Sequence, residues 1–391
     1  MKSEWKTIRA ADFMEFNPRM NLKKGTIATK ISMDKLQPYT KKIPETEQAE
    51  FSGGTKFSNS DTIMARITPC LENGKTAFVD CLNKDEVAFG STEFIVLRAK
   101  PGVSDAQFVY YLATSPEFRQ VAIKSMVGSS GRQRVQQPVL ENLELVVPEL
   151  PKQKRIGGFL AAIDDKIALN AKINDNLYDL VNTLYTKLFK DTGCEMTTVE
   201  DYVDCIYSGG TPATSNMAYW NGNLNWLSSG ETRNRFVIST EKTITQLGAD
   251  NSSTKSAQKY DIVIASAGQG FTRGQTSMLL LNTYINQSVI VLHAKKTVLP
   301  YLFWNLTNRY DDLRAISDSS SIRGSLTTKM LSKLKIPKVE DSLILKFSEF
   351  AWSIIPQIEN NLIENKRLTD LRDSLLPKLM SGEIDVSDIQ L

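Results

Sequence analysis

The most regular hydrophobic pattern of the chain lies near its middle. Residues 156–188 carry an apolar residue or an asparagine at alternating spacings of three and four. This heptad period places the ten positions on one stripe of an α-helix, and the 33 residues predict a helix about 50 Å long at 1.5 Å per residue. The stripe consists of Ile156, Leu160, Ile163, Ile167, Asn170, Asn174, Leu177, Val181, Leu184 and Leu188.

The same stripe returns 191 residues later. From Phe159 to Leu188, 11 of 30 residues are identical to the residue 191 positions further on, against about two expected by chance. Arg372 is the one charged residue of the second stripe, and we expect Pro356 to break or kink that helix and Pro377 to weaken its last turn. The second stripe consists of Phe347, Ala351, Ile354, Ile358, Asn361, Asn365, Leu368, Arg372, Leu375 and Leu379.

Asparagines at the centre of both stripes bear on how the two helices pair. If the helices run antiparallel with matched ends, Asn170 faces Asn365 and Asn174 faces Asn361, so each seam amide meets an amide. Parallel pairing also matches asparagines, and packing of each helix on its own domain alone is a third arrangement. We favour the antiparallel pair, because a large region separates the helices and a repeated chain is compatible with an internal two-fold axis.

The region of about 150 residues before each helix has the short apolar runs of a mixed α and β domain. We expect strands at residues 62–66, 94–97, 262–265 and 288–292, and the repeat continues here with changed offsets. The predicted fold class is α+β: two similar mixed α/β domains separated by two long antiparallel coiled-coil helices, with an internal pseudo-two-fold repeat. The predicted segments are a first domain, a central helix, a second domain and a C-terminal helix with a tail, at 1–150, 151–190, 191–338 and 339–391.

Composition narrows the class of protein. The hydrophobic content of 41% and charged content of 23% are typical of soluble globular proteins, and no apolar run is long enough to cross a membrane. The N-terminal segment lacks the apolar core of a signal peptide, so we expect a cytoplasmic protein. Cys70, Cys81, Cys194 and Cys205 form no CxxC pair, which predicts free thiols and no metal site. A net charge of +3 requires that any contact with nucleic acid come from local basic patches.

Residues suited to catalysis are largely missing. The single histidine, His293, falls in a predicted strand where the first half has Arg98, and we expect it to be a packing or surface residue. Residues 74–76 resemble the end of a phosphate-binding P-loop, but Pro69 replaces its first glycine and Gln275 replaces its lysine in the second copy. No zinc-protease, nucleophile-elbow or amino-methyltransferase motif occurs in the sequence. We therefore predict no catalytic residue on this chain.

Polar loops that contain glycine or serine recur at equivalent places in both halves. Arginine and lysine pair with phosphates or guanine edges, glutamine and asparagine pair with adenine edges, and glycine lets the backbone approach closely. Such loops are also common as ordinary solvated turns, so it is their recurrence that favours contact with nucleic acid. The predicted DNA-binding residues are Arg66, Lys75, Arg132, Gln133, Arg134, Arg273, Gln275 and Arg323.

Taken together, these features make the chain similar to the specificity subunit of bacterial type I restriction-modification systems, over essentially its whole length. The resemblance rests on the two-fold repeat, on residues 163–174 of the central helix, on the block at 55–75 and on the C-terminal segment 371–384. In that family, two target-recognition domains each read one half of an interrupted DNA site. Two long antiparallel helices hold them apart and dock methyltransferase subunits. Pro356 and Arg372 depart from a regular seam.

The resemblance implies a non-catalytic subunit whose partners are double-stranded DNA, two methyltransferase subunits and restriction/translocase subunits. It implies no cofactor on this chain, with S-adenosylmethionine (SAM), ATP and Mg²⁺ on the partner subunits. Helices about 50 Å long would let two domains reach half-sites about one turn of B-DNA apart, at roughly 34–36 Å. The alternatives are a coiled-coil scaffold that joins two protein-binding domains without reading DNA, and an ATP-using enzyme built on residues 74–76. The sequence does not identify the bases that are read.

Overall fold

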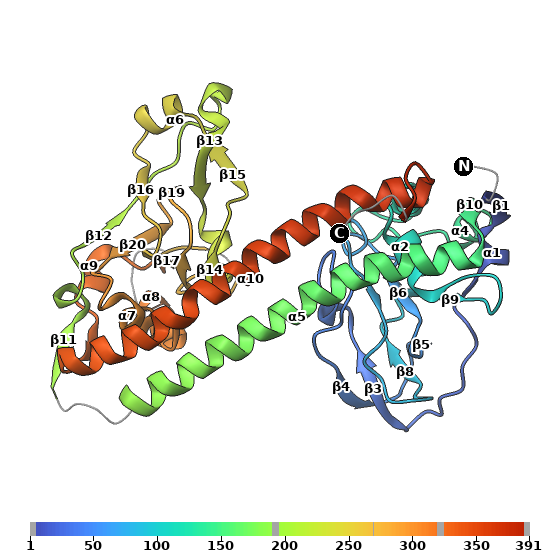
Figure 1. Ribbon diagram of the computed structural model, residues 1–391, viewed down its shortest axis with the longest axis horizontal. Coiled ribbons are helices and arrows are strands. Elements are labelled where there is room, and N and C mark those ends of the chain that lie inside the picture. Colours follow the sequence, from blue (N-terminus) through green and yellow to red (C-terminus); the bar gives the residue numbers. More distant parts are fainter. Residues whose placement is uncertain (1–4, 190–194, 269, 319–323, 387–391) are drawn as a thin grey trace. The chain divides into compact units, whose positions relative to one another are not determined.

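The computed structural model describes residues 5–189, 195–268, 270–318 and 324–386 (Figure 1). The chain forms two compact units. The first contains Met1–Leu169 together with Asn365–Leu391, and the second contains Asn170–Glu364. Two long helices, α5 (Leu150–Phe189) and α10 (Asp341–Ser381), each contribute one segment to each unit. The chain is therefore of mixed α+β class with two long helices, as the sequence predicts.

The first unit holds two four-stranded sheets and a two-stranded ribbon. In the first sheet the order is β2-β9-β6-β7 with antiparallel neighbours, and in the second it is β4-β3-β8-β5 with β3 and β8 parallel. The ribbon pairs β1 with β10. The strands are β1 (Trp5–Arg9), β2 (Met14–Phe16), β3 (Ile27–Ile31), β4 (Glu47–Glu50), β5 (Thr55–Phe57), β6 (Thr62–Ala65), β7 (Thr76–Phe78), β8 (Ala88–Gly90), β9 (Phe94–Ala99) and β10 (Glu144–Pro148). The short helices are α1 (Ala10–Phe13), η2 (Met33–Lys35), α2 (Ala106–Thr114), α3 (Pro116–Lys124) and α4 (Gln137–Glu141).

The second unit repeats this plan strand by strand. Its sheets have the orders β12-β20-β17-β18-β14 and β15-β13-β19-β16, with β13 and β19 parallel, and its ribbon pairs β11 with β21. The extra strand β14 lies beside β18. The strands are β11 (Met196–Thr198), β12 (Cys205–Ser208), β13 (Trp220–Leu227), β14 (Phe236–Val237), β15 (Lys242–Ile244), β16 (Lys255–Ala257), β17 (Ile262–Ala265), β18 (Thr276–Leu279), β19 (Thr283–Ile285), β20 (Val289–His293) and β21 (Lys335–Pro337). The short helices are η3 (Val199–Asp201), η4 (Met217–Tyr219), η5 (Ser229–Arg233), α6 (Gln246–Asp250), α7 (Leu299–Thr307), α8 (Tyr310–Asp318) and α9 (Thr328–Ser332).

Local sequence explains where the short helices of the first unit begin and end. The Asp105 carboxylate accepts a hydrogen bond from the Phe108 amide at 3.0 Å and so caps α2. Ser115 ends α2 and caps α3, whose first residue is Pro116, a residue that tolerates this position because it needs no amide partner there. Between these caps, α2 packs against the sheet β2-β9-β6-β7 and buries Phe108, Tyr110 and Tyr111.

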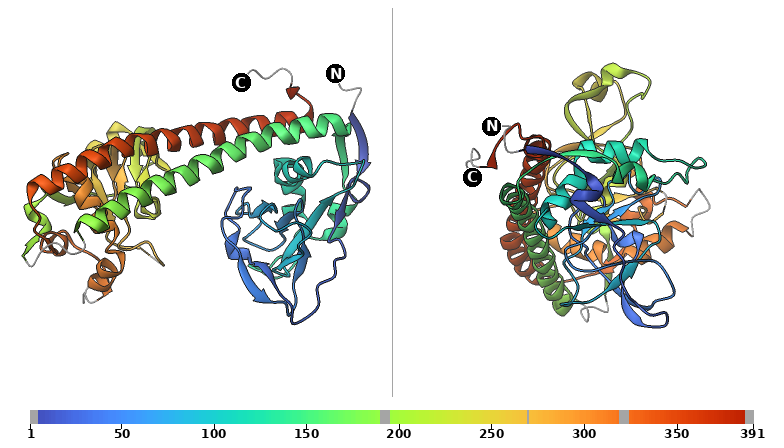
Figure 2. Two further views of the ribbon diagram at one scale, coloured as in Figure 1. Left: turned by 60° about the horizontal axis from the view of Figure 1, so that its bottom comes forward. Right: turned by 90° about the vertical axis from the view of Figure 1, so that its right-hand side faces the viewer.

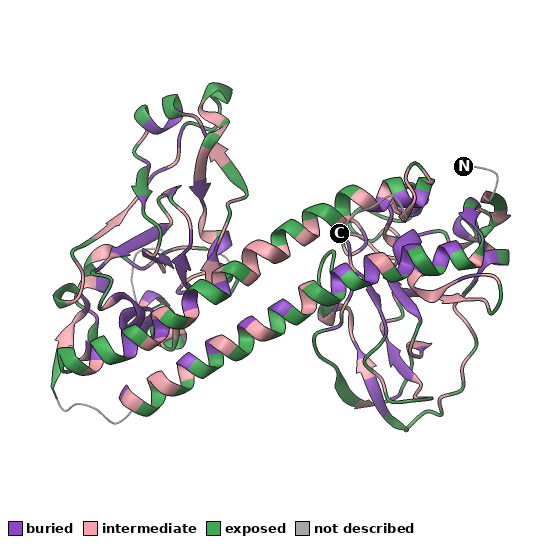
Figure 3. Cartoon of the chain, viewed as in Figure 1, coloured by how far each residue is buried: buried purple, intermediate pink, exposed green. Residues whose placement is uncertain are grey.

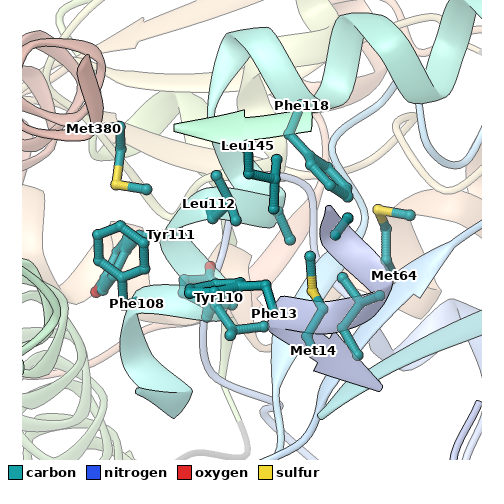
Figure 4. Packing of buried hydrophobic residues seen from close by; sticks show 14 of the residues in the cluster. Phe13, Met14, Met64, Phe108, Tyr110, Tyr111, Leu112, Phe118, Leu145 and Met380 are labelled. Carbon is teal, nitrogen blue, oxygen red and sulfur yellow. The ribbon is translucent and has the colours of Figure 1, made fainter. Parts of the chain in front are cut away.

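Each unit has a large hydrophobic core that includes one end of each long helix. In the first unit the core contains Phe13, Phe108 and Phe118 (Figure 4). Leu160 of α5 and Leu379 of α10 belong to the same cluster. In the second unit the core is built around the aromatic residues of α7, and Val181 of α5 and Ile355 of α10 belong to it. Figure 3 shows that burial is concentrated in the sheets and on one face of each helix. The helices are thus fixed by packing against both domains rather than by helix propensity.

Most of the predicted elements are present. Residues 262–265 form β17 as expected, whereas β6 ends one residue early, β9 runs on to Ala99, and β20 is shifted to Val289–His293. None of the fourteen predicted seam residues is exposed. Those residues are Ile163, Ile167, Asn170, Asn174, Leu177, Leu184, Leu188, Ile354, Ile358, Asn361, Asn365, Leu368, Leu375 and Leu379.

The expected break at Pro356 was wrong, since α10 is continuous from Asp341 to Ser381. A kink at Pro356 and a weaker last turn at Pro377 stay predictions. Pro356 lies on the exposed face of the helix, between the buried Ile355 and Ile358. Water can therefore bond the carbonyl that proline leaves unpaired, while packing of the flanking isoleucines keeps the helix in place.

Candidate nucleic-acid interface

In the first domain, backbone hydrogen bonds join three loops that are distant in sequence. The Arg66 amide donates to the Glu93 carbonyl at 2.9 Å, the Val135 amide donates to the Arg66 carbonyl at 2.9 Å, and the Thr68 amide donates to the Gln133 carbonyl at 3.0 Å. Four predicted DNA-binding residues, at 66 and 132–134, therefore share one surface. Their side chains differ in what they are bound to.

Among these four residues, Arg132 is the most available for contact. It is exposed, and its side chain has no hydrogen bond or ion pair with any residue that the structure describes. Arg134 instead forms a bidentate pair with Glu93, with the closest N–O distance at 2.6 Å, and this bond lowers the pKa of the Glu93 carboxyl. Arg66 donates to the Val135 carbonyl at 3.3 Å, and Gln133 is half-buried.

Lys75 is held within the domain. Its ammonium donates to the Met33 carbonyl at 2.9 Å, which ties the loop after β6 to η2. The next residue, Thr76, begins the strand β7 rather than a helix. A P-loop needs a helix at this point, so the structure agrees with rejecting a nucleotide site at residues 74–76.

The second domain has equivalent backbone hydrogen bonds between its loops, but different side chains. The Ser266 amide donates to the Ser288 carbonyl and the Leu326 amide donates to the Ser266 carbonyl, both at 2.9 Å. Ser266 and Ser288 occupy the places of Arg66 and Glu93, at the offsets of 200 and 195. The same backbone hydrogen bonds thus hold an arginine and a glutamate in the first domain and two serines in the second, of which Ser266 is buried.

One predicted contact of the second domain is bound internally, and a second has a buried side-chain oxygen. The Arg273 guanidinium, whose side chain is 17% exposed, donates to the Gly324 carbonyl and to the Asp318 carboxylate at the end of α8. The Gln275 side-chain oxygen is buried without a partner among the described residues. Arg323 lies outside the residues that the structure describes. Contact of these three residues with DNA stays a prediction.

Sequence reasoning missed Phe271, which lies in the same loop as Arg273. Its side chain is 79% exposed, and the Arg314 guanidinium lies 5.8 Å from the ring centre. The Tyr310 hydroxyl donates to the Phe271 carbonyl at 2.9 Å. A single aromatic residue inside a glycine-rich polar loop was the signal in the sequence that could have identified it.

The histidine and its counterpart in the first half have parallel structural roles. His293 at the end of β20 contacts the buried Asp261 carboxylate at 2.6 Å, and Arg98 on β9 binds the buried Asp61 carboxylate at 2.6 and 2.7 Å. Burial raises the pKa of Asp261, although His293 opposes that effect. His293 is half-buried and paired in a strand, and its expected role as a packing or surface residue stays a prediction.

The helices α5 and α10 run side by side (Figure 2), and hydrogen bonds join them in both units. In the second unit Asn361 donates to the Asn174 side-chain oxygen at 2.8 Å, and Asn174 donates to the Ile358 carbonyl at 3.2 Å. In the first unit Asn365 donates to the Ile167 carbonyl at 3.1 Å. Within the second unit, Asn170 donates to Glu364 at 2.6 Å. The expected contact between Asn174 and Asn361 is therefore present.

One charged pair interrupts the apolar stripe in the first unit. The Arg372 guanidinium of α10 donates to the Asp164 carboxylate of α5 at 2.6 Å, and the Tyr111 hydroxyl donates to the other oxygen of Asp164 at 2.6 Å. The side chains of Arg372 and Asp164 are 11% and 5% exposed. The unexpected charge in the second stripe thus has a buried partner.

Two further expectations concern membranes and metals. None of the helices in the described part of the chain is long and apolar enough to cross a membrane. Within the same residues, no three His, Cys, Asp or Glu side chains come together as metal ligands, and Cys70, Cys81 and Cys205 are free thiols. Cys194 lies outside the described residues.

Comparison with known proteins gives consistent matches. A family model described as a type I restriction modification DNA specificity domain matches residues 2–178 and 193–367. The type I restriction enzyme HindI specificity subunit of Haemophilus influenzae is 23% identical over 407 residues, which cover 84% of this chain and 87% of that protein. The EcoAI specificity subunit of Escherichia coli is 36% identical over 104 residues, or 27% of this chain and 18% of that one.

A solved structure shows the same fold. The S subunit of the type I restriction-modification system of M. genitalium aligns with a TM-score of 0.59 and 17% identity over 96% of both chains. The repeated domain plan therefore occurs in another protein of low sequence identity.

Proposed function

The chain belongs to the type I restriction modification DNA specificity family, and we propose that each of its two domains reads one half of an interrupted DNA target. Its role in such a system is DNA recognition. The internal repeat is the observation that supports a two-part DNA target. The strand orders match between the domains, while serines take the places of the loop residues Arg66, Glu93 and Arg134 in the second domain. A shared scaffold with different loop side chains is what reading two different sequences requires.

The long helices are the proposed spacer between the two reading domains. Their partners run in opposite order: Asp164 and Ile167 of α5 bond Arg372 and Asn365 of α10, in that order. In the second unit, Asn170 and Asn174 bond Glu364 and Asn361. These bonds support an antiparallel coiled coil with polar layers at its centre. The proposed segments are a first reading domain at 1–150, the spacer helices at 151–190 and 339–391, and a second reading domain at 191–338.

Catalysis is proposed to reside on partner subunits. Two methyltransferase subunits would dock on this chain and bring SAM, and restriction/translocase subunits would bring ATP and Mg²⁺. An internal repeat presents related surfaces twice, which suits two copies of one partner. The assembled complex is proposed to work in the cytoplasm.

Binding to defined duplexes tests this function. The chain alone and its complex with methyltransferase subunits should be titrated with a matched site and with a scrambled site at several salt concentrations. We expect the complex to prefer the matched site by about 10³ or more, and the chain alone to bind weakly. Equal affinity of the complex for both sequences would contradict DNA recognition, and binding that ignores DNA altogether would favour a protein scaffold.

A further inference from the structure

Phe271 is a large apolar side chain that the second domain holds out into solvent. Its exposure of 79% is the greatest among the exposed large hydrophobic residues of the chain that the structure describes. A phenylalanine ring left in water forgoes the stabilisation that burial provides. A single exposed ring is unremarkable by itself, so the case depends on how the loop around it is built and on what surrounds it.

Hydrogen bonds fix the backbone on both sides of the ring. The Arg314 guanidinium donates to the Gly270 carbonyl at 2.7 Å, and the Tyr310 hydroxyl donates to the Phe271 carbonyl at 2.9 Å. Arg273 is anchored to α8 through Asp318. Side chains of one helix thus hold the loop at residues 270, 271 and 273 while the ring itself stays exposed. The loop is preorganised to present Phe271 rather than to bury it.

The residue at the corresponding position of the first domain is buried rather than exposed. At the offset of 200 that relates the two loops, the residue that corresponds to Phe271 is Leu71, which is completely buried in the core of the first domain. Both loops follow equivalent strands, β6 and β17, and are joined to their domains by equivalent backbone bonds. The outward ring is therefore a difference between the two loop surfaces, and it lies where the two domains are proposed to read different sequences.

The surroundings of the ring favour nucleic acid over an apolar protein surface. Arg314 lies beside the ring, and the preceding residue, Gly270, is exposed with a positive φ angle of +62°, so the loop turns sharply there and carries no side chain. Phosphates are attracted to the guanidinium, and the missing side chain at Gly270 lets the backbone come close to a groove. Aromatic and other apolar side chains that enter a duplex act as wedges between base steps.

We propose that the Phe271 ring inserts between two neighbouring bases of the half-site read by the second domain, separates them, and stacks on one of them. This inference rests on the proposed function and adds a residue that determines local DNA conformation. Because Leu71 is buried, the half-site read by the first domain has no such wedge from the equivalent position. The ring would discriminate between half-sites through the ease with which a given step unstacks, since flexible pyrimidine-purine steps open more readily than others.

The complex of this chain with its methyltransferase subunits is the material for the test. Duplexes carry 2-aminopurine at successive positions of each half-site, except at the methylated adenine, which the methyltransferase itself is expected to extrude. Fluorescence rises where 2-aminopurine is unstacked. The variants are Phe271→Ala, which removes the ring, Phe271→Tyr, which keeps it, and Met196→Ala, which removes another exposed apolar side chain, on β11.

We expect the parent complex to raise the fluorescence at one step of the second half-site. Phe271→Ala should abolish that rise and weaken binding to the matched site by roughly 5- to 150-fold, the range measured for loss of one stacked base. Phe271→Tyr should keep the rise, Met196→Ala should change nothing, and the signal in the first half-site should be the same for all variants.

Unchanged fluorescence and affinity in Phe271→Ala would overturn the wedge. Impaired assembly of this variant with the methyltransferase in the absence of DNA would overturn it too, because the ring would then contact protein. Failure of the proposed function is distinguishable, since it appears as a parent complex that does not prefer its matched site at all.

Discussion

The buried pair of Asp164 and Arg372 allows a quantitative test of how the two long helices are held together. Removal of one partner of a buried ion pair costs about 3–5 kcal/mol, because the other charge stays behind without compensation. In Arg372→Val the Asp164 carboxylate, only 5% exposed, keeps the Tyr111 hydroxyl as its one hydrogen-bond donor among the described residues, so we expect a loss near 5 kcal/mol on that scale. In Asp164→Ile the guanidinium retains Asp373 at 2.8 Å, so the loss should be nearer 3 kcal/mol on the same scale.

The second unit supplies the design of the compensating variant. The residues that correspond to Asp164 and Arg372 across the repeat are Ile355 and Val181, and both are completely buried in the second core. Replacement of a buried ion pair by apolar residues of similar volume is often neutral or stabilising by about 1–4 kcal/mol. Tyr111 would lose its acceptor in such a variant, at a cost of about 1–3 kcal/mol. We therefore expect Asp164→Ile with Arg372→Val to lie within about 3 kcal/mol of the parent, and addition of Tyr111→Phe to restore most of the remainder.

Thermal unfolding of the full chain by calorimetry measures these differences. For a unit of 150–250 residues, 1 kcal/mol shifts the midpoint by about 2–4 °C, so each single variant should lower the transition of the first unit by roughly 6–20 °C. The double variant should be much more stable than it would be if the two single losses were additive. Two results would refute the reasoning that the charges depend on each other. One is a single-variant loss under about 1 kcal/mol, and the other is a double variant whose loss equals or exceeds the sum of the two single losses.

Three further outcomes are expected. Arg132→Ala should weaken binding of the complex to its matched site by about 1–3 kcal/mol if the side chain reads a base, or flatten the salt dependence if it binds a phosphate. Ser130→Ala in the same exposed loop is the control and should leave affinity unchanged; equal affinity of Arg132→Ala and the parent would mark an ordinary turn. Burial raises the pKa of Asp261 in the folded chain. The folded state therefore loses stability as the pH rises and the carboxyl ionises, and the loss is absent at pH values below the ordinary pKa of an aspartate. His293→Arg, which copies Arg98, places a permanent cation beside Asp261, so it should stabilise the second unit more at pH 8 than below the ordinary pKa of an aspartate, where the carboxyl is protonated; equal gains in melting temperature would contradict this. Insertion of one helical turn near the end of α5 should lengthen the spacer between the methylated half-sites without changing either one, and an unchanged spacer would rule out the helices as the ruler.

Features set by local periodicity were predictable from the sequence. The heptad stripe gave the long helices, the repeated offset gave two similar domains, and apolar runs gave the strands around residues 62–65 and 262–265. These patterns reflect which face of an element is buried, and burial imposes the same spacing wherever it occurs.

The availability of individual side chains was not predictable in this way. Arg134 is bound by Glu93, 41 residues away, and Arg273 by Asp318, 45 residues away, so both partners depend on the tertiary fold. Pro356 failed as a helix breaker because the packing of its neighbours outweighs local propensity. The exposure of Phe271 depends on anchors in α8 that no local pattern reveals.

The central claim is that each domain reads its own half of one DNA site. It is tested most directly by mapping methylated adenines in the genome of a host that carries the complex, first with this chain and then with residues 1–150 replaced by the equivalent domain of a relative. We predict that one half of the methylated sequence changes while the other half and the spacer stay the same. A change in both halves, or in neither, would contradict the claim.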